Sequence, residues 1–344
     1  MVSIVVFAIV IFGMIVLASP SATSAQNDRI FLHPSFNPES SADYVKISDM
    51  EPNSFGYFMY PSSYNFSDSA NAYQRFLLIR LPSWLGGDKN DVSSYRAYSM
   101  VDLDSHCMIK YWPQDGRQRI EDPCHFEMYR IIDGASYYFG IDTMSKPVEN
   151  ALPQLDLGAD NDGYLYVKTP SWDVNKNGIV GDGRHLSKGQ VLNTSSFMLE
   201  QYKKHAKNNI HIPLSFEDGS FLIEISNGEE DAHFSYTSEK PTMDTPSINI
   251  SFCNCTGSTV NAFSDNPEGH ATSWQVGNNR IYAYDPFVDN NGKSLGKYNF
   301  EFYQDGYLVI FNSQTSFDKG MKMTLDAFFN GTKLSDIEQV SIEK

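Results

Sequence analysis

Short runs in which apolar and polar residues alternate dominate the chain from about residue 40 to residue 185. Runs of about four to eight residues that are rich in aromatic and β-branched side chains are typical of β-strands with one buried face. The sequences GGD at 86–88 and DNDG at 160–163 separate such runs and favour tight turns. The pattern therefore predicts a compact antiparallel β domain over residues 40–185. Its strands are expected within YVKI, FLLIRLP, YRAYSMV, CMIKYW, FEMYRII, SYYFGI and GYLYVK.

The pattern changes at residues 186–207, which we interpret as a linker that contains a short helix. Ser and Thr residues, which can cap a helix, open the sequence TSSFMLEQYKKHA at 194–206. Phe197, Tyr202 and Ala206 then recur at roughly helical spacing. This pattern predicts a short helix over residues 194–206.

Residues 208–344 return to a strand-like pattern. Tyr298, Phe300 and Phe302 alternate with polar residues, which indicates one core-facing side of a strand. We therefore predict a second β-rich, sandwich-like domain of unknown role and an all-β fold class for the whole chain. Its strands are expected within INISF, NRIYAYDPF, KYNFEFY and YLVIFN.

Residues 1–25 have the composition of an export segment. An uncharged apolar run from Val2 to Ala18 precedes small residues, with a candidate cleavage point after Ala25. A membrane-spanning helix needs about 20 apolar residues, so the run fits both a signal peptide and an N-terminal membrane anchor. We expect an extracytoplasmic protein, either secreted or anchored to the membrane by this segment.

The charge balance limits the classes of partner. The chain has 26 basic and 42 acidic residues and a net charge of −16, which repels nucleic acid. Its 344 residues are enough to bury a core without a metal ion. The sequence has no Gly-x-Ser-x-Gly, His-Glu-x-x-His or phosphate-binding glycine motif. These observations give no support to a hydrolase or a nucleotide-dependent enzyme.

The four cysteines, Cys107, Cys124, Cys253 and Cys255, allow three disulfide pairings. An oxidising compartment favours disulfides, and pairing 107 with 124 and 253 with 255 keeps each bond within one predicted domain. Cys253 and Cys255 would also project from the same face of a strand, so a soft metal ion such as copper or zinc is an alternative there. No His or Met nearby completes such a site, which favours the second disulfide.

An ordered set of segments over roughly residues 45–185 resembles the Rieske iron-sulfur protein family, in particular its archaeal-type members. The resemblance implies a Rieske-like antiparallel β domain. Intact relatives pass electrons from quinols within cytochrome b-type complexes. The matching segments are FLLIRLP (76–82), YRAYSMV (95–101), DPCH (122–125) with Tyr129, ALPQLDL (151–157), GYLYVK (163–168) and NGIVGDGR (177–184).

In that family, one loop supplies Cys-x-His and a further Cys, and a second loop supplies Cys-Pro-Cys-His-Gly-Ser. Two cysteines and two histidines bind a 2Fe-2S cluster, and the other two cysteines form a disulfide. On this pattern, Cys107 and Cys124 occupy the disulfide positions. The four ligand positions hold Asp102, Asp104, Asp122 and His125, so that only the histidine keeps its ligand identity.

This departure predicts that the chain has lost the cluster, because carboxylates are poor substitutes for thiolate and imidazole on these irons. Phe126 and Glu127 also replace the Gly-Ser of the second loop. No cofactor is therefore expected. The four former ligand positions could instead bind one divalent ion, but we favour a metal-free loop pair whose aspartates turn to solvent or pair with Arg117 or Arg119.

The resulting functional hypothesis is an exported Rieske-like protein without a catalytic site. It would act as a structural or accessory protein through protein partners at the outer face of the membrane, beside a cytochrome b-type respiratory complex. Two alternatives remain at this point. One is 2Fe-2S electron transfer with atypical ligation, and the other is divalent metal binding at the carboxylate-histidine site or at Cys253 and Cys255.

Overall fold

The structure of the chain is a computed structural model in which β-strands dominate the described residues and only two α-helices occur among them. Every strand pairing is antiparallel. The all-β prediction is thereby confirmed. The structure describes residues 29–32, 44–61, 69–102, 105–113, 118–138, 151–168, 183–226, 232–238, 248–254, 272–285 and 295–340.

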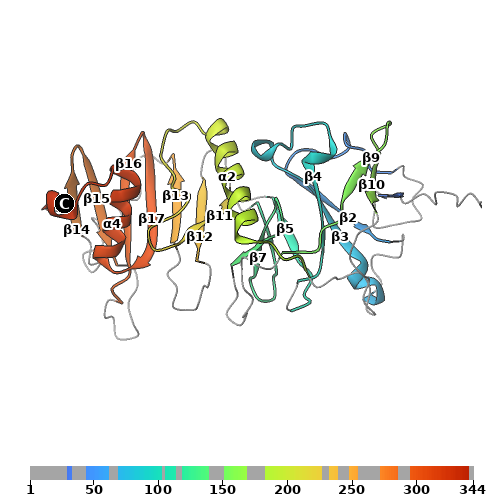
Figure 1. Ribbon diagram of the computed structural model, residues 1–344, viewed down its shortest axis with the longest axis horizontal. Helices are drawn as coiled ribbons and strands as arrows, with labels where there is room; N and C mark the ends of the chain where they lie inside the picture. Colours follow the sequence, from blue (N-terminus) through green and yellow to red (C-terminus); the bar gives the residue numbers. More distant parts are fainter. Residues whose placement is uncertain are drawn as a thin grey trace, which may run out of the picture.

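The first half of the molecule consists of three small sheets, which lie together at one end of an elongated shape (Figure 1). The Asp160 carboxylate accepts hydrogen bonds from the backbone N–H groups of Asp162 and Tyr164, at 3.0 and 2.8 Å, and so closes the predicted turn between β9 and β10. The first sheet contains, in spatial order, β1 (Arg29–Phe31), β10 (Leu165–Lys168) and β9 (Leu157–Ala159). The second contains β2 (Ser54–Met59), β3 (Arg75–Arg80) and β4 (Tyr95–Ser99). The third contains β5 (Lys110–Trp112), β6 (Arg119–Glu121), β7 (Met128–Arg130) and β8 (Ser136–Tyr138). Short 3-10 helices are η1 (Ser69–Gln74), η2 (Ser83–Leu85), η3 (Val92–Ser94) and η4 (Leu334–Asp336).

The second half is one eight-stranded sheet rather than two facing sheets, with α4 (Phe317–Phe328) packed on one side (Figure 1). Helix α4 covers this face of the sheet, where a sandwich would have a second sheet. Its Phe317 and Phe328 rings pack against Phe300 and Phe302 of the sheet. The strands are, in spatial order, β11 (Phe221–Ser226), β12 (His233–Thr237), β13 (Ile248–Cys253), β17 (Tyr307–Thr315), β16 (Tyr298–Gln304), β15 (Asn279–Tyr284), β14 (Thr272–Val276) and β18 (Glu338–Val340).

The predicted helix is present as α2 (Lys188–His205), and it begins six residues before the predicted start at 194. Ser187 and Gln190 explain the earlier start. The Ser187 hydroxyl accepts the Gln190 N–H at 3.3 Å, and the Gln190 side chain accepts the Ser187 N–H at 2.8 Å. This reciprocal capping box satisfies two N–H groups that the first helical turn otherwise leaves without partners.

A continuous hydrophobic core joins the two halves, and α2 lies across the junction (Figure 1). The fully buried Arg130 of β7 crosses the same junction: its guanidinium donates to the Ser195 hydroxyl at 3.1 Å and to the Ile223 carbonyl at 2.9 Å. It also donates to Asp133 at 2.6 Å. Burial opposes ionisation of Asp133, but the Arg130 guanidinium outweighs it and lowers the pKa of that carboxyl.

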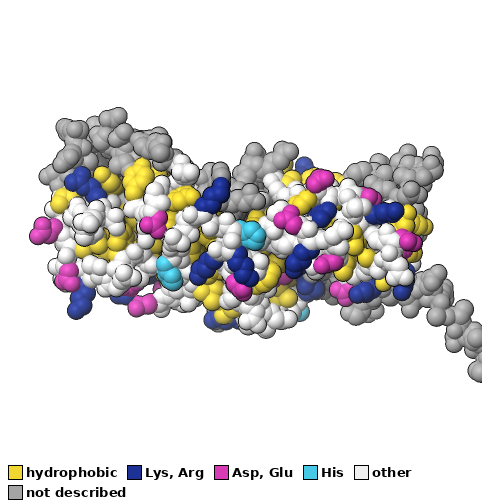
Figure 2. Space-filling view, turned by 90° about the horizontal axis from the view of Figure 1, so that it is seen from above, with side chains coloured by type: hydrophobic (Ala, Val, Ile, Leu, Met, Phe, Trp, Pro, Cys, Tyr) yellow, Lys and Arg dark blue, Asp and Glu magenta, His cyan; other side chains and the backbone are white. Residues whose placement is uncertain are grey.

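The face of the molecule drawn in Figure 2 has no large patch of described side chains of one charge sign. Acidic and basic side chains are interspersed along the molecule, with hydrophobic side chains between them (Figure 2). Within the described ranges, no helix combines the length and hydropathy needed to cross a bilayer. The predicted export segment, residues 1–25, lies outside the described residues.

The side of the eight-stranded sheet away from α4 carries polar residues along β16. Along β16, Phe300 and Phe302 face α4, so Asn299 and Glu301 project to the opposite side. Both are nevertheless buried. Burial raises the pKa of the Glu301 carboxyl to about 7, although a hydrogen bond from Tyr284 acts in the opposite direction.

Gly320 of α4 should be required for the helix to lie against the sheet. A Cβ at this position would lie 2.7 Å from the Ser313 hydroxyl oxygen and closer still to the Phe300 ring. We expect Gly320→Ala to lower the free energy of unfolding by about 1–3 kcal/mol, measured by urea titration. Gly189→Ala in α2 is the matched control, since its Cβ would meet only Ser187 Oγ at 4.0 Å. The control should be neutral or stabilising, and equal losses in both variants would contradict the packing argument.

Glu301 should make stability depend on pH between about 4.5 and 7. The folded protein keeps the Glu301 proton up to about pH 7, whereas the unfolded chain releases it near 4.5, so the folded state binds more protons in this window. Stability should therefore fall as pH rises through it, by up to about 3 kcal/mol. The measurement is urea unfolding of the wild type and Glu301→Gln across this range. A wild-type slope that the substitution leaves unchanged would refute the assignment.

Candidate functional site

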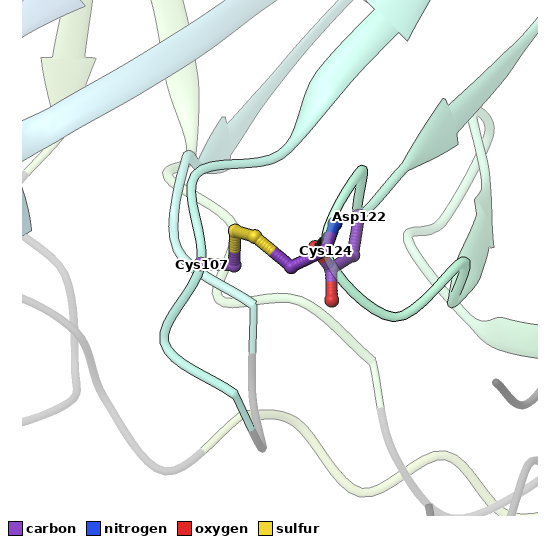
Figure 3. A group of neighbouring side chains, drawn as sticks. All are labelled: Cys107, Asp122 and Cys124. Atoms are coloured by element: carbon purple, nitrogen blue, oxygen red, sulfur yellow. Dashed lines mark hydrogen bonds between the residues drawn. A yellow bond between two sulfur atoms is a disulfide. The ribbon is translucent and has the colours of Figure 1, made fainter. Parts of the chain in front are cut away.

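Two loops meet at one end of the sheet formed by β5 to β8. The first loop connects β4 to β5 and contains Asp102 and Cys107, and the second connects β6 to β7 and contains Asp122 and Cys124. Because β5 pairs with β6 in an antiparallel register, the end of the first loop lies beside the start of the second. A disulfide joins Cys107 to Cys124, whose Cα atoms are 6.4 Å apart (Figure 3). This is the pairing that the family resemblance implies.

Asp102 is fully buried at the start of the first loop. Its Oδ1 atom accepts hydrogen bonds from the Ser105 N–H at 2.6 Å and from the Ser105 hydroxyl at 2.8 Å. Its Oδ2 atom accepts from the Tyr129 hydroxyl at 2.7 Å. Both oxygens of this carboxylate therefore have donors within the protein.

Asp122 is equally buried, and it holds the turn of the second loop. Its Oδ1 atom accepts the Cys124 N–H at 2.7 Å, and its backbone carbonyl accepts the Phe126 N–H at 2.8 Å. Its Oδ2 atom lies 3.1 Å from both the Ser105 hydroxyl and His125 Nδ1. The His125 side chain is 43% exposed, so the imidazole covers the carboxylate from the solvent side.

The structure thus brings Asp102, Asp122 and His125 together with the disulfide. Asp104 and Arg117 lie outside the described residues. The prediction that these aspartates turn to solvent was wrong for Asp102 and Asp122, because both carboxylates are buried within the loop pair. The predicted pairing of the aspartates with Arg119 was also wrong, because the Arg119 guanidinium forms an ion pair with Glu121 at 3.0 Å. The aspartates order the loops by accepting hydrogen bonds.

Sequence reasoning missed Ser105, whose single hydroxyl lies within hydrogen-bonding distance of Asp102 and Asp122. The same oxygen accepts the Cys107 N–H at 3.1 Å. The signal was present in the sequence, because Asp followed three residues later by Ser is a frequent pattern in turns closed by side chains. The link to Asp122 crosses from one loop to the other, and local spacing does not contain that information.

Phe126 preserves a backbone feature of the second loop. It stands where the family motif has glycine, and its φ of 66° is in the left-handed region that glycine adopts most readily. Its side chain is 58% exposed. The neighbouring Glu127 is buried, and its carboxylate accepts the Ser136 hydroxyl at 2.8 Å. The turn therefore keeps its shape with a bulky apolar residue at its tip.

The donor set of this site does not fit a 2Fe-2S cluster. The irons of such a cluster bind thiolates and imidazoles, whereas Asp102 and Asp122 offer hard carboxylate oxygens that already accept hydrogen bonds. The sulfurs of Cys107 and Cys124 are consumed by the disulfide. Ligand atoms of Cys107, Asp122 and Cys124 lie within 4.8 Å of one another, but only the carboxylate of this group is a ligand in the oxidised state (Figure 3).

Cys253 is the last residue of β13. Cys253 is disulfide-bonded, so it has no thiolate to offer a soft metal ion. Cys255 lies outside the described residues.

Two curated relatives resemble part of this chain. A Rieske subunit assigned to a respiratory nitrate reductase of Haloferax mediterranei is 36% identical over 92 residues, which are 27% of this chain and 36% of the relative. The cytochrome bc1 complex Rieske iron-sulfur subunit of Streptomyces lividans is 35% identical over 69 residues, which are 20% of this chain and 36% of the relative. The chain thus spans about a third of the length of the curated relatives it matches. No protein-family model matches it.

Solved structures with some likeness are Rieske oxygenases. The terminal oxygenase of carbazole 1,9a-dioxygenase from Novosphingobium sp. KA1 is 11% identical, with a TM-score of 0.22 over 85% of this chain and 80% of the oxygenase. A quaternary ammonium Rieske monooxygenase with L-carnitine is also 11% identical, with a TM-score of 0.22 over 70% of this chain and 61% of that structure. Likeness at this level carries no argument.

Ser105 should stabilise the loop pair more than an ordinary surface serine does. Ser105→Ala removes one donor from two buried carboxylates, so we expect the free energy of unfolding to fall by about 1–3 kcal/mol in urea titrations. Ser335→Ala is the matched control, because its hydroxyl donates to the exposed Asp336 carboxylate at 2.8 Å. The control should change stability by less than about 0.5 kcal/mol. Similar values for the two variants would contradict the role of Ser105.

Proposed function

Because this chain carries a Rieske-like domain, we propose that it is a member of that family without a 2Fe-2S cluster, which acts as a structural or accessory protein for protein partners. The observation that carries the proposal is the chemistry at the former ligand positions. Asp102 and Asp122 are buried carboxylates whose oxygens accept hydrogen bonds from within the protein.

The hydrogen bonds at these carboxylates oppose metal binding of any kind. A cluster or ion would have to replace the contacts from Tyr129, Ser105 and the Cys124 N–H. Each hydrogen bond to a charged group contributes about 1.5–3 kcal/mol, and a displaced donor that stays buried costs more. Thiolate ligands would offset this cost by binding the metal, but Cys107 and Cys124 cannot supply them because they are bonded to each other.

The frame around the former cluster site supports a structural role. The disulfide, the Tyr129 contact and the left-handed Phe126 turn hold the two loops in a fixed shape. A fixed loop pair that lacks redox ligands can still serve as a contact surface for another protein. The relatives' names place them in a respiratory nitrate reductase and in a cytochrome bc1 complex, so both are subunits that work with partner proteins.

The proposal extends to location. The apolar run from Val2 to Ala18 and the small residues after it support export, with the described residues outside the cytoplasm. The disulfide supports the same compartment, since such bonds persist in oxidising surroundings. We therefore propose that the protein acts at the outer face of the membrane beside a cytochrome b-type respiratory complex.

Metal analysis and spectroscopy of the protein purified from its native membrane test this function. We expect no stoichiometric iron, no visible absorption of a Rieske centre and no corresponding low-temperature EPR signal, because the ligand atoms are carboxylate oxygens. A cluster signal from the wild-type protein at full occupancy would overturn the proposal.

A gain-of-ligand variant provides the positive control for this experiment. Asp102→Cys, Asp104→His and Asp122→Cys together restore the family's ligand types beside His125. We expect this triple variant to take up iron and sulfide on reconstitution and to show the EPR signal. The same variant with His125→Ala should lose it. If the triple variant stays colourless although it is folded, the loop frame no longer has the shape of a cluster site.

A further inference from the structure

Five Asn-x-Ser/Thr sequons occur in the chain, and the structure distinguishes them by the surroundings of each triplet. In an exported protein such a triplet accepts an N-linked glycan where it lies on the surface. Chance also produces these triplets, so the spacing alone assigns nothing. Asn65 and the Thr256 hydroxyl of the Asn254 sequon lie outside the described residues. The sequons begin at Asn65, Asn193, Asn249, Asn254 and Asn330.

Two of the described sequons lack the exposure that glycan transfer to the folded protein requires. Asn249 lies within β13, which is paired at this residue with β12 on one side and with β17 on the other. Asn193 is exposed on α2, but the hydroxyl of its triplet belongs to Ser195, which is buried. That hydroxyl accepts a hydrogen bond from the Arg130 guanidinium at 3.1 Å. Neither triplet therefore presents both its amide and its hydroxyl at the surface.

The turn that follows α4 presents the last sequon on the surface. Asn330 and Gly331 are both exposed and have left-handed backbones, with φ of 52° and 69°. Asparagine and glycine tolerate this conformation best, and it ends a helix. The Gly331 N–H donates to the Leu325 carbonyl at 3.1 Å, and the Thr332 hydroxyl donates to the Phe329 carbonyl at 2.7 Å. These contacts hold the turn without the side-chain amide of Asn330.

We propose that Asn330 carries an N-linked glycan, which is transferred from a sugar chain bound through phosphate to a membrane lipid. The Nδ2 atom of Asn330 forms a bond to C1 of the first sugar. The bond between C1 and the phosphate oxygen breaks, and the phosphate leaves with the electron pair. One proton leaves the amide, so the step oxidises and reduces nothing. The half-buried Thr332 supplies the hydroxyl of the triplet.

The position of this turn is compatible with the proposed partner contacts. Helix α4 lies in the half of the molecule away from the loop pair (Figure 1). A glycan on the turn after α4 would therefore leave the loops around Cys107 and Cys124 accessible to another protein. The inference rests on the proposed export, because N-glycosylation is a modification of secreted proteins.

Peptide mass spectrometry of the protein purified from its native membrane tests the site, and protease treatment of intact cells locates the protein independently. Tryptic cleavage after Lys322 and Lys333 gives a peptide of residues 323–333 whose single sequon is that of Asn330. We expect this peptide to carry a mass increment of at least one sugar residue. An unmodified peptide from a protein outside the cytoplasm would overturn the inference and leave the proposed export intact. A cytoplasmic location would contradict both.

Substitutions at both ends of the triplet assign the modification. Asn330→Asp keeps the shape of the side chain and tolerates a left-handed backbone but lacks the amide nitrogen, so the increment should be lost completely. Thr332→Val removes the hydroxyl and should abolish the increment, whereas Thr332→Ser keeps the hydroxyl and should retain it. Asn193→Asp on α2 is the matched control and should leave the increment unchanged. An increment that persists in Asn330→Asp would overturn the assignment, and so would equal loss in the two Thr332 variants.

Discussion

Two buried carboxylates and the hydroxyl between them organise the loop pair at the centre of this protein. A carboxylate removed from water must find donors in the protein, and Asp102 and Asp122 find them in the residues that shape the two loops. Ser105 links the two carboxylates, because its hydroxyl lies within hydrogen-bonding distance of both Asp102 and Asp122. The disulfide between Cys107 and Cys124 then cross-links the two loops that these hydrogen bonds align. In this arrangement the carboxylate oxygens order the two loops by accepting hydrogen bonds.

The loop pair is attached to the remainder of the molecule through its own strands. β7 follows the second loop directly, and its Arg130 is fully buried at the junction with α2 and β11. A buried guanidinium needs acceptors on several sides, and here they come from a helix hydroxyl, a strand carbonyl and a carboxylate. The sheets β2–β3–β4 and β5–β8 consequently share a core with the large sheet, whereas β9 and β10 pack in a separate cluster.

The sequence was informative wherever one local pattern decided the outcome. Strong alternation predicted β16 and β17, and an aspartate-rich turn predicted the β9–β10 hairpin. Weak or mixed patterns failed: α4 contains Gly320 and follows directly on a strand, so its helical face was not recognised. At the site, the motif led us to expect Asp102, Asp122 and His125 close together, but not the burial of the two carboxylates, because Tyr129 reaches Asp102 and Ser105 reaches Asp122 from distant parts of the chain. Local spacing contains no such contacts.

The two halves of the protein bury carboxylates in opposite ways. Asp102 and Asp122 have donors at both oxygens, so adding a ligand there would break existing hydrogen bonds. Glu301 has a donor at one oxygen only, and burial raises its pKa to about 7, which means that the isolated charge is unfavourable in this place. The loop pair therefore satisfies its buried carboxylates with hydrogen bonds, whereas the large sheet favours the protonated form of Glu301 up to about pH 7.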